Sequence, residues 1–154
     1  MKRGVLRAFG IGTLALGIAI QFLPNGRHHT NPLMRVEPSW DSARTRELFM
    51  RACADCHSNE TKWPWYSHVA PVSWFVQMHV DVGRAHLNLS RWSADMASDA
   101  GEVSSRIRRG DMPLRSYLLA HPEARLTASE KAELDRGLTA TFRASATSTD
   151  FQSE

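Results

Sequence analysis

The apolar residues of the chain recur at helical spacing, and no stretch alternates apolar and polar positions as a half-buried strand does. We therefore expect an all-α fold. The first helix of the folded part is predicted to start after a cap at Ser39 or Asp41 and to run to about Ala52. Its apolar face is predicted to consist of Thr45, Leu48, Phe49 and Ala52.

Two further helices are predicted in the middle of the chain. One begins near Pro71, because proline is well tolerated in the first turn of a helix. The other spans about Ser98 to Arg109, with acidic residues early, arginines late and Gly110 as a stop signal. The apolar stripe of the Pro71 helix comprises Val72, Phe75, Val76, His79, Val80, Gly83 and Leu87.

The last helix has a clear start signal. Thr127 and Glu130 are three residues apart, in the pattern of a capping box. The buried face that follows is predicted to contain Leu134, Leu138 and Phe142.

The N-terminal segment has the pattern of a membrane-targeting sequence. Lys2, Arg3 and Arg7 precede an uncharged and mostly apolar run from Ala8 to Leu23. As a helix this run reaches about 24 Å, and adding the residues before Arg7 brings it near the bilayer core of about 30 Å. Since no small-residue cleavage site follows Leu23, we favour an uncleaved anchor over a cleaved signal peptide. In either case the domain is exported and the positive end stays in the cytoplasm.

These patterns divide the chain into four segments. Residues 1–23 are the anchor or signal segment, and 24–38 are a linker rich in Pro, Asn and charge, in which the pair His28 and His29 is expected to be solvated. Residues 39–143 form the domain, and 144–154 are a Ser/Thr-rich tail, expected to be flexible.

The charge distribution argues against a nucleic-acid-binding protein. The formal net charge of the chain is +3, but residues 1–38 alone carry five Lys or Arg against one Glu. The remainder holds 14 basic and 15 acidic residues, so the domain has no excess of positive charge. A protein that binds phosphate backbones carries that excess on its folded domain.

The sequence Cys53-Ala54-Asp55-Cys56-His57 contains the only two cysteines of the chain. Cys-x-x-Cys-His is the attachment signature of c-type haem. Two cysteines on one turn of backbone can form thioethers with both vinyl groups of a single porphyrin, and the next residue can place its imidazole beneath the iron. The sequence therefore predicts one covalent haem c, with Cys53 and Cys56 as its attachment points and His57 as a ligand.

Three alternatives remain open for this motif. A thioredoxin-like thiol site would follow a strand, whereas a helix precedes Cys53. A structural zinc site would need a fourth ligand, which no second ligand pair at zinc-finger spacing supplies. The last alternative is a chance occurrence of the motif.

A second axial ligand would have to come from elsewhere in the chain. Met112 follows a helix stop and precedes Pro113, which stiffens the approach of a loop to a porphyrin face. We therefore predict His57 and Met112 as the metal ligands. The alternatives are an open sixth position or a histidine, of which the candidates are His68, His79 and His86.

Aromatic residues cluster after the motif and are predicted to surround the haem. Their rings would cover its edges, and indole N–H groups can reach a propionate. The imidazole N–H of His57 needs an acceptor, for which we favour the carbonyl of Pro71 over that of Pro64. The residues predicted to contact the cofactor are Trp63, Trp65, Tyr66, Pro71 and Trp74, with Lys62 as a further propionate candidate.

The run CADCHSNETKWPWYSHVAPVSW resembles the bacterial haem-binding-domain family, small exported proteins similar to c-type cytochromes. The resemblance continues through HLNLSRW to GDMPLRSYLLAHPEARLTASEKAEL, so it covers nearly all of residues 40–142. It implies a mono-haem, cytochrome c-like helical domain behind a membrane segment. It supports Cys53, Cys56 and His57 in the roles given above, and Met112 matches the Met-Pro element of the family.

These observations favour a membrane-tethered, periplasm-facing electron carrier over an enzyme. A six-coordinate iron leaves no position for a substrate, and its redox partner proteins are not indicated by the sequence. The alternative is a haem enzyme or gas sensor with an open or displaceable sixth ligand, in which His68 or Arg115 would act on the bound molecule. As in cytochrome c folds, the helix before Cys53 is expected to pack on the last helix, with Leu48 and Phe49 against Leu134 and Leu138.

Overall fold

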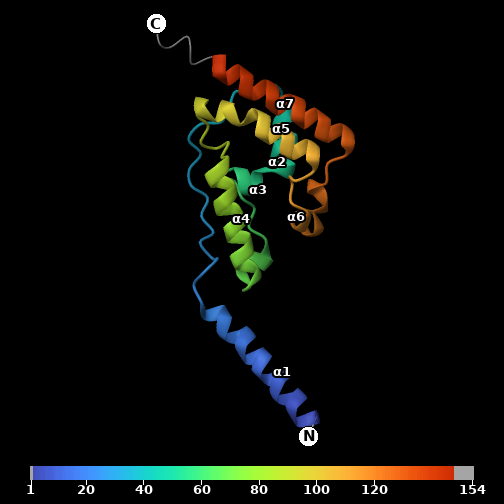
Figure 1. Ribbon diagram of the computed structural model, residues 1–154. Coiled ribbons are helices and arrows are strands. Elements are labelled where there is room, and N and C mark those ends of the chain that lie inside the picture. Colours follow the sequence, from blue (N-terminus) through green and yellow to red (C-terminus); the bar gives the residue numbers. More distant parts are fainter. Residues whose placement is uncertain (1, 148–154) are drawn as a thin grey trace.

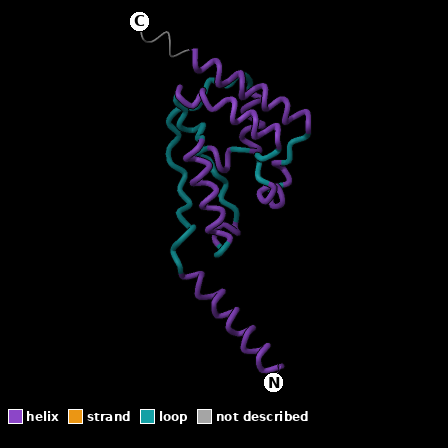
Figure 2. Tube along the Cα trace, in the orientation of Figure 1, coloured by secondary structure: helices purple, strands orange, loops and turns teal. Residues whose placement is uncertain are grey.

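The computed structural model describes residues 2–147, so most of the predicted tail, residues 148–154, lies outside the described part of the chain. Every regular element in that part is helical, and the only strand-like pairing described is an isolated bridge between Val36 and Arg91. Figure 2 shows helices joined by loops throughout. The predicted all-α fold is confirmed.

The N-terminal helix α1, Lys2–Ala19, is followed by the 3-10 turn η1, Ile20–Phe22. It stands away from the rest of the protein, and none of its residues is buried (Figure 1). The stretch Lys2–Phe22 is long and apolar enough to cross a membrane, a property that signal sequences share. A helix with an apolar surface and no protein cover is compatible with the predicted anchor.

Three helices form the upper layer of the domain. α2 is Ala43–Ala52, α5 is Ala100–Arg109 and α7 is Ala128–Thr147. Figure 1 shows α5 and α7 side by side, with α2 beneath them. The core between them includes every residue predicted for the contact of the first and last helices, namely Leu48, Phe49, Leu134 and Leu138, together with Phe142.

The backbones of α2 and α7 approach closely at one point. A Cβ added to Gly137 would lie 1.9 Å from the Thr45 hydroxyl oxygen, which is far inside any allowed contact. Thr45 is itself held at the start of α2, because its backbone N–H donates to Ser42 Oγ at 3.1 Å. Ser42 is therefore the cap of this helix, and the predicted caps, Ser39 and Asp41, are wrong by one to three residues.

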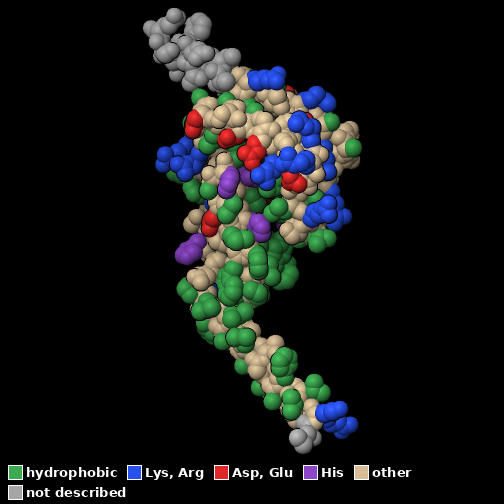
Figure 3. Space-filling model, viewed as in Figure 1, with side chains coloured by type: hydrophobic (Ala, Val, Ile, Leu, Met, Phe, Trp, Pro, Cys, Tyr) green, Lys and Arg blue, Asp and Glu red, His purple; other side chains and the backbone are tan. Residues whose placement is uncertain are grey.

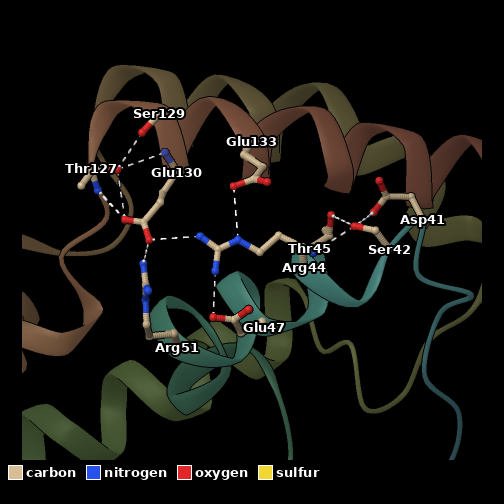
Figure 4. Close-up of polar contacts among 10 residues, drawn as sticks. All are labelled: Asp41, Ser42, Arg44, Thr45, Glu47, Arg51, Thr127, Ser129, Glu130 and Glu133. Atoms are coloured by element: carbon tan, nitrogen blue, oxygen red, sulfur yellow. Dashed lines mark hydrogen bonds and ion pairs between the residues drawn. The ribbon is translucent and has the colours of Figure 1, made fainter.

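Arginines of α2 bind the first turns of α7 (Figure 4). Arg51 donates to Glu130 Oε1 at 2.5 Å, and Arg44 reaches Glu130 and Glu133, each at 3.3 Å. Glu130 also accepts from the Thr127 backbone N–H at 2.8 Å, while Thr127 Oγ1 accepts from the Glu130 N–H at 3.2 Å. The predicted capping box is confirmed, and its glutamate also joins the two helices.

The lower part of the domain is built around α4, Val72–His86. Its buried side chains are Ser73, Gln77 and Val80, with Gly83 on the same face, whereas Val72 and Phe75 are exposed. The predicted apolar stripe is therefore confirmed for Val80, Gly83 and Leu87, which are buried, and wrong for Val72 and Phe75. The other two predicted members, Val76 and His79, are half-buried. The remaining elements are α3 Ala54–His57, η2 Trp65–His68, η3 Ala94–Asp99, α6 Arg115–Ala120 and η4 Pro122–Ala124.

Residues 24–38 lie along the domain and bond to it repeatedly. The Arg84 guanidinium donates to the Thr30 carbonyl at 2.9 Å and to Asn31 Oδ1 at 3.0 Å. Further along, the Arg35 N–H donates to the Ser90 carbonyl at 3.0 Å. His29 is half-buried, so the prediction of a solvated histidine pair is wrong for this residue.

Candidate functional site

The Cys-x-x-Cys-His motif lies where α2 ends and the single turn α3 begins. Cys53 closes α2 and opens α3, and its carbonyl accepts from the N–H groups of Cys56 at 3.2 Å and His57 at 3.0 Å. This one turn keeps both cysteines and the imidazole on adjoining positions of a fixed backbone. Both thiols are free and partly buried.

The environment of the two cysteines keeps them protonated. Burial raises the pKa of Cys53 to about 12, and burial followed by the nearby Asp55 carboxylate raises the pKa of Cys56 to about 11. Cysteines of thiol-exchange sites have a lowered pKa, because the thiolate is the reactive form. The geometry and charge here therefore do not favour the thioredoxin-like alternative.

His57 is oriented by one backbone carbonyl. Its Nδ1 lies 3.0 Å from the carbonyl oxygen of Leu87, just beyond the end of α4. Burial lowers the pKa of His57, which favours the neutral ring with Nδ1–H as donor. Nε2 is then the nitrogen with a free lone pair, the arrangement typical of a metal-binding histidine. The predicted acceptor, Pro71, is wrong: its carbonyl accepts from the Trp74 N–H at 3.1 Å, at the start of α4.

Helix α4 touches the motif through a glycine. A Cβ on Gly83 would lie 2.5 Å from the Cys56 carbonyl oxygen, so only glycine permits this approach. One turn after Gly83, the chain leaves α4 and presents the Leu87 carbonyl to His57. The close contact therefore sets the position of the acceptor that orients the imidazole.

Asp55, between the two cysteines, receives three hydrogen bonds from the surrounding chain. Tyr117 of α6 donates its hydroxyl to Asp55 Oδ2 at 2.7 Å, and the Lys62 N–H donates to Oδ1 at 2.9 Å. The hydroxyl of Thr61 donates to the Asp55 carbonyl at 2.7 Å. Burial, followed by the bond to Asp55, raises the pKa of Tyr117, so the phenol remains a donor.

Met112 lies in the loop between α5 and α6 and is half-buried. The loop starts at Gly110, whose φ of 73° is the left-handed conformation that ends α5, as the sequence predicts. The Asp111 N–H donates back to the Arg106 carbonyl at 3.0 Å. Downstream, the bond of Tyr117 to Asp55 ties the loop to the motif, so the segment carrying Met112 is held at both ends.

The alternative ligands are spread over two elements. His79 and His86 each bond through Nδ1 to a carbonyl of their own helix, at 2.7 Å from Phe75 and 2.9 Å from Val82. His68, in η2, contacts His29 edge-on at a ring-centroid distance of 4.4 Å. All three stay predictions, as does Met112.

The tryptophans predicted near the haem have different surroundings. Trp63 stacks on His29, with ring centroids 4.2 Å apart, and Trp74 lies against Gly26. The buried indole N–H groups of both have no hydrogen-bond partner in the described structure, as expected of donors kept for a propionate. Trp65 is 79% exposed. Their contact with a haem stays a prediction.

Tyr66 is connected to the motif through His121 and Tyr117. Its hydroxyl lies 2.7 Å from His121 Nε2, and the His121 ring stacks on Tyr117 with a centroid distance of 4.1 Å. No local spacing in the sequence indicates Tyr117 or His121, because they come from α6 and its C-terminal end, which are distant from the motif along the chain.

Arg84 was also missed by the sequence analysis. It donates to the Ser58 carbonyl at 2.8 Å, directly after the motif, and to the Thr61 hydroxyl at 2.8 Å. Together with its bonds to Thr30 and Asn31, these contacts join the motif, α4 and residues 24–38 into one unit.

The donor set of this site fits a haem: two free thiols and an imidazole on one turn, with the imidazole fixed through Nδ1. A search of curated proteins and of solved structures finds no match to the chain. The profile of the haem-binding domain family, however, matches residues 15–140. This match covers most of the chain and includes all the residues of the candidate site, and the chain therefore belongs to the haem-binding domain family.

Proposed function

We propose that the protein is a c-type cytochrome that carries single electrons at the periplasmic face of the inner membrane, to which α1 tethers it. Cys53 and Cys56 would hold one haem through two thioethers, and His57 and Met112 would be the ligands of its iron. A bound haem supplies an iron that gains and loses one electron; the protein supplies its orientation and cover.

The observation that carries this proposal is the bond between His57 Nδ1 and the Leu87 carbonyl. It fixes the ring and directs the remaining lone pair of Nε2 away from the backbone, as a proximal ligand requires. The adjacent thiols on the same turn add the attachment chemistry.

Met112 as the second ligand is supported by the way its loop is fixed. A thioether ligand favours the ferrous state and raises the reduction potential relative to a second imidazole. Tyr117, Asp55 and the α5 cap keep the loop in place, so oxidation and reduction would need little rearrangement.

The test is a pyridine haemochrome spectrum of protein made in a host with haem-attachment machinery. We expect one haem per chain with two thioether links, and a single link in Cys53→Ala. Pigment that is extracted by acid acetone would contradict covalent attachment. Met112→Ala should change the ferric spectrum and lower the potential; an unchanged spectrum would show that Met112 is not a ligand.

A further inference from the structure

Several apolar side chains at the end of the domain nearest α1 are exposed. Trp65 is 79% exposed, Val69 42%, Val72 45% and Phe75 60%. These four residues are called the juxtamembrane edge below; Trp65 belongs to η2, Val69 directly follows it, and Val72 and Phe75 lie in the first turn of α4. Exposed aromatic and branched side chains gathered at one place are typical of a surface that contacts a partner or lipid.

The juxtamembrane edge is joined to the end of α1 by a pair of hydrogen bonds. Gln21 of η1 donates through Nε2 to the Ala70 carbonyl at 2.9 Å, and the Ala70 N–H donates to Gln21 Oε1 at 3.0 Å. Ala70 lies between Val69 and Val72, in the middle of the edge. Because the bonds satisfy both backbone groups of Ala70, this residue can approach an apolar phase without an unpaired donor or acceptor.

The composition around the edge matches the interfacial layer of a bilayer. Between Lys62 and Asp81 the chain has no Lys, Arg, Asp or Glu, but it contains three tryptophans and a tyrosine. Trp and Tyr are enriched where a membrane meets water. Figure 3 shows the hydrophobic side chains of the lower domain continuing into those of α1, while the basic and acidic side chains gather mainly over its upper part.

We propose that the juxtamembrane edge is seated in the interfacial layer of the same bilayer that α1 spans. The inference rests on the proposed role of α1 as an uncleaved anchor. The juxtamembrane edge is occupied by lipid, because it is continuous with the apolar surface of α1 and carries no charge that a protein partner could pair with. The consequence is a domain held against the membrane in one orientation by two attachments, α1 and the edge.

The edge also accounts for the exposed side of α4. Ser73, Gln77 and Gly83 are buried, and Gly83 brings α4 close to the motif, whereas Val72 and Phe75 are exposed on the outer side. In water this arrangement would expose large apolar groups without compensation. Insertion in the interfacial layer removes them from water.

The test uses the full haem-loaded chain in phosphatidylcholine vesicles that contain a lipid with a photoactivatable carbene group near the glycerol end of its acyl chain. After irradiation, labelled peptides are mapped by mass spectrometry. We expect label in α1 and in residues 63–80, the latter several-fold above the peptide containing Leu119. Leu119 is an internal control, because it is 80% exposed but belongs to α6.

A matched pair of variants completes the experiment. Phe75→Gln should lower the labelling of residues 63–80 several-fold and leave that of α1 unchanged, whereas Leu119→Gln should change neither. Label in α1 with only background in residues 63–80 would overturn the inference and leave the anchor in place; a protein partner on the edge would give this result. Label in neither region would refute the anchor itself, and the inference with it.

Discussion

The hydroxyl of Tyr117 donates to the carboxylate of Asp55 at 2.7 Å, so a residue five positions after Met112 is bonded to the centre of the cysteine motif. This contact is a direct side-chain bond between α6 and α3. It sets how far the loop that carries Met112 can move from His57, because the other end of that loop is fixed by the cap of α5.

Replacing Tyr117 with phenylalanine tests this connection. The variant removes the donor to Asp55 Oδ2, although the Lys62 N–H still donates to Oδ1. We therefore expect a loss of about 1–2 kcal/mol in the free energy of unfolding, measured by denaturant titration. In the haem-loaded protein the ferric absorption band of methionine ligation should weaken. Tyr66→Phe is the matched control: it loses the bond to His121 but leaves Asp55 intact, and it should keep that band. Equal effects of both variants would contradict the proposed connection.

Gly83 provides a second prediction. Alanine at this position would drive its Cβ into the Cys56 carbonyl and push α4 away from the motif. We expect Gly83→Ala to destabilise the protein by about 1–3 kcal/mol and to disturb the acceptor of His57. Gly101→Ala is the control, because its Cβ meets nothing within 4 Å and helix propensity favours alanine. Thermal unfolding of both variants decides the matter, and equal melting temperatures would refute the role of Gly83.

The contact between Gly137 and Thr45 leads to a third prediction. Gly137→Ala should destabilise the packing of α2 on α7, because the new Cβ would overlap the side chain of Thr45. Thr45→Ala removes two of the three atoms in that overlap. The double variant should therefore be more stable than the sum of the single losses predicts, with a coupling energy of about 1 kcal/mol or more. Strict additivity would show that the helices shift apart instead.

The sequence was sufficient for the elements whose signals are local. The cap at Gly110, the capping box at Thr127 and the core face of α7 all depend on residues within two turns of one another. The family resemblance likewise depends on short runs of consecutive residues, of which the Cys-x-x-Cys-His motif is the first, and these runs are spread over most of residues 40–142. Each of these predictions is confirmed by the structure or by the family match.

The remainder depends on contacts that have no local pattern. The hydrogen-bond acceptor for His57 is the backbone carbonyl of Leu87. Because every residue has a backbone carbonyl, the residue types along the chain do not indicate which one accepts this bond. On α4, hydrophobicity alone suggested that Val72 and Phe75 are buried, but the buried face contains Ser73, and it is Gly83 that packs closely on Cys56. An apolar stripe on a helix can pack in a protein core or contact a membrane, and the sequence pattern is the same in both cases.

Glu130 makes the stability of the fold depend on pH. The Thr127 N–H, followed by the Arg51 guanidinium, lowers the pKa of Glu130 from its ordinary 4.5 to about 2. The unfolded chain therefore binds more protons than the folded one between these two values. The stabilisation by Glu130 is complete above about pH 4.5 and is lost as the pH falls toward 2.

Glu130→Gln should consequently flatten the dependence of the unfolding free energy on pH in this interval, while lowering stability at neutral pH. Arg51→Met removes one of the two main causes of the lowered pKa of Glu130. The slope of its unfolding free energy against pH should therefore lie between those of the wild type and Glu130→Gln. Urea unfolding measured at several pH values between 2 and 6 gives the slopes directly. If the unfolding free energy of Glu130→Gln depended on pH as steeply as that of the wild type, other carboxyl groups would be responsible for the loss of stability in acid. Protonation at the junction of α2 and α7 would then not be the step that first destabilises the fold.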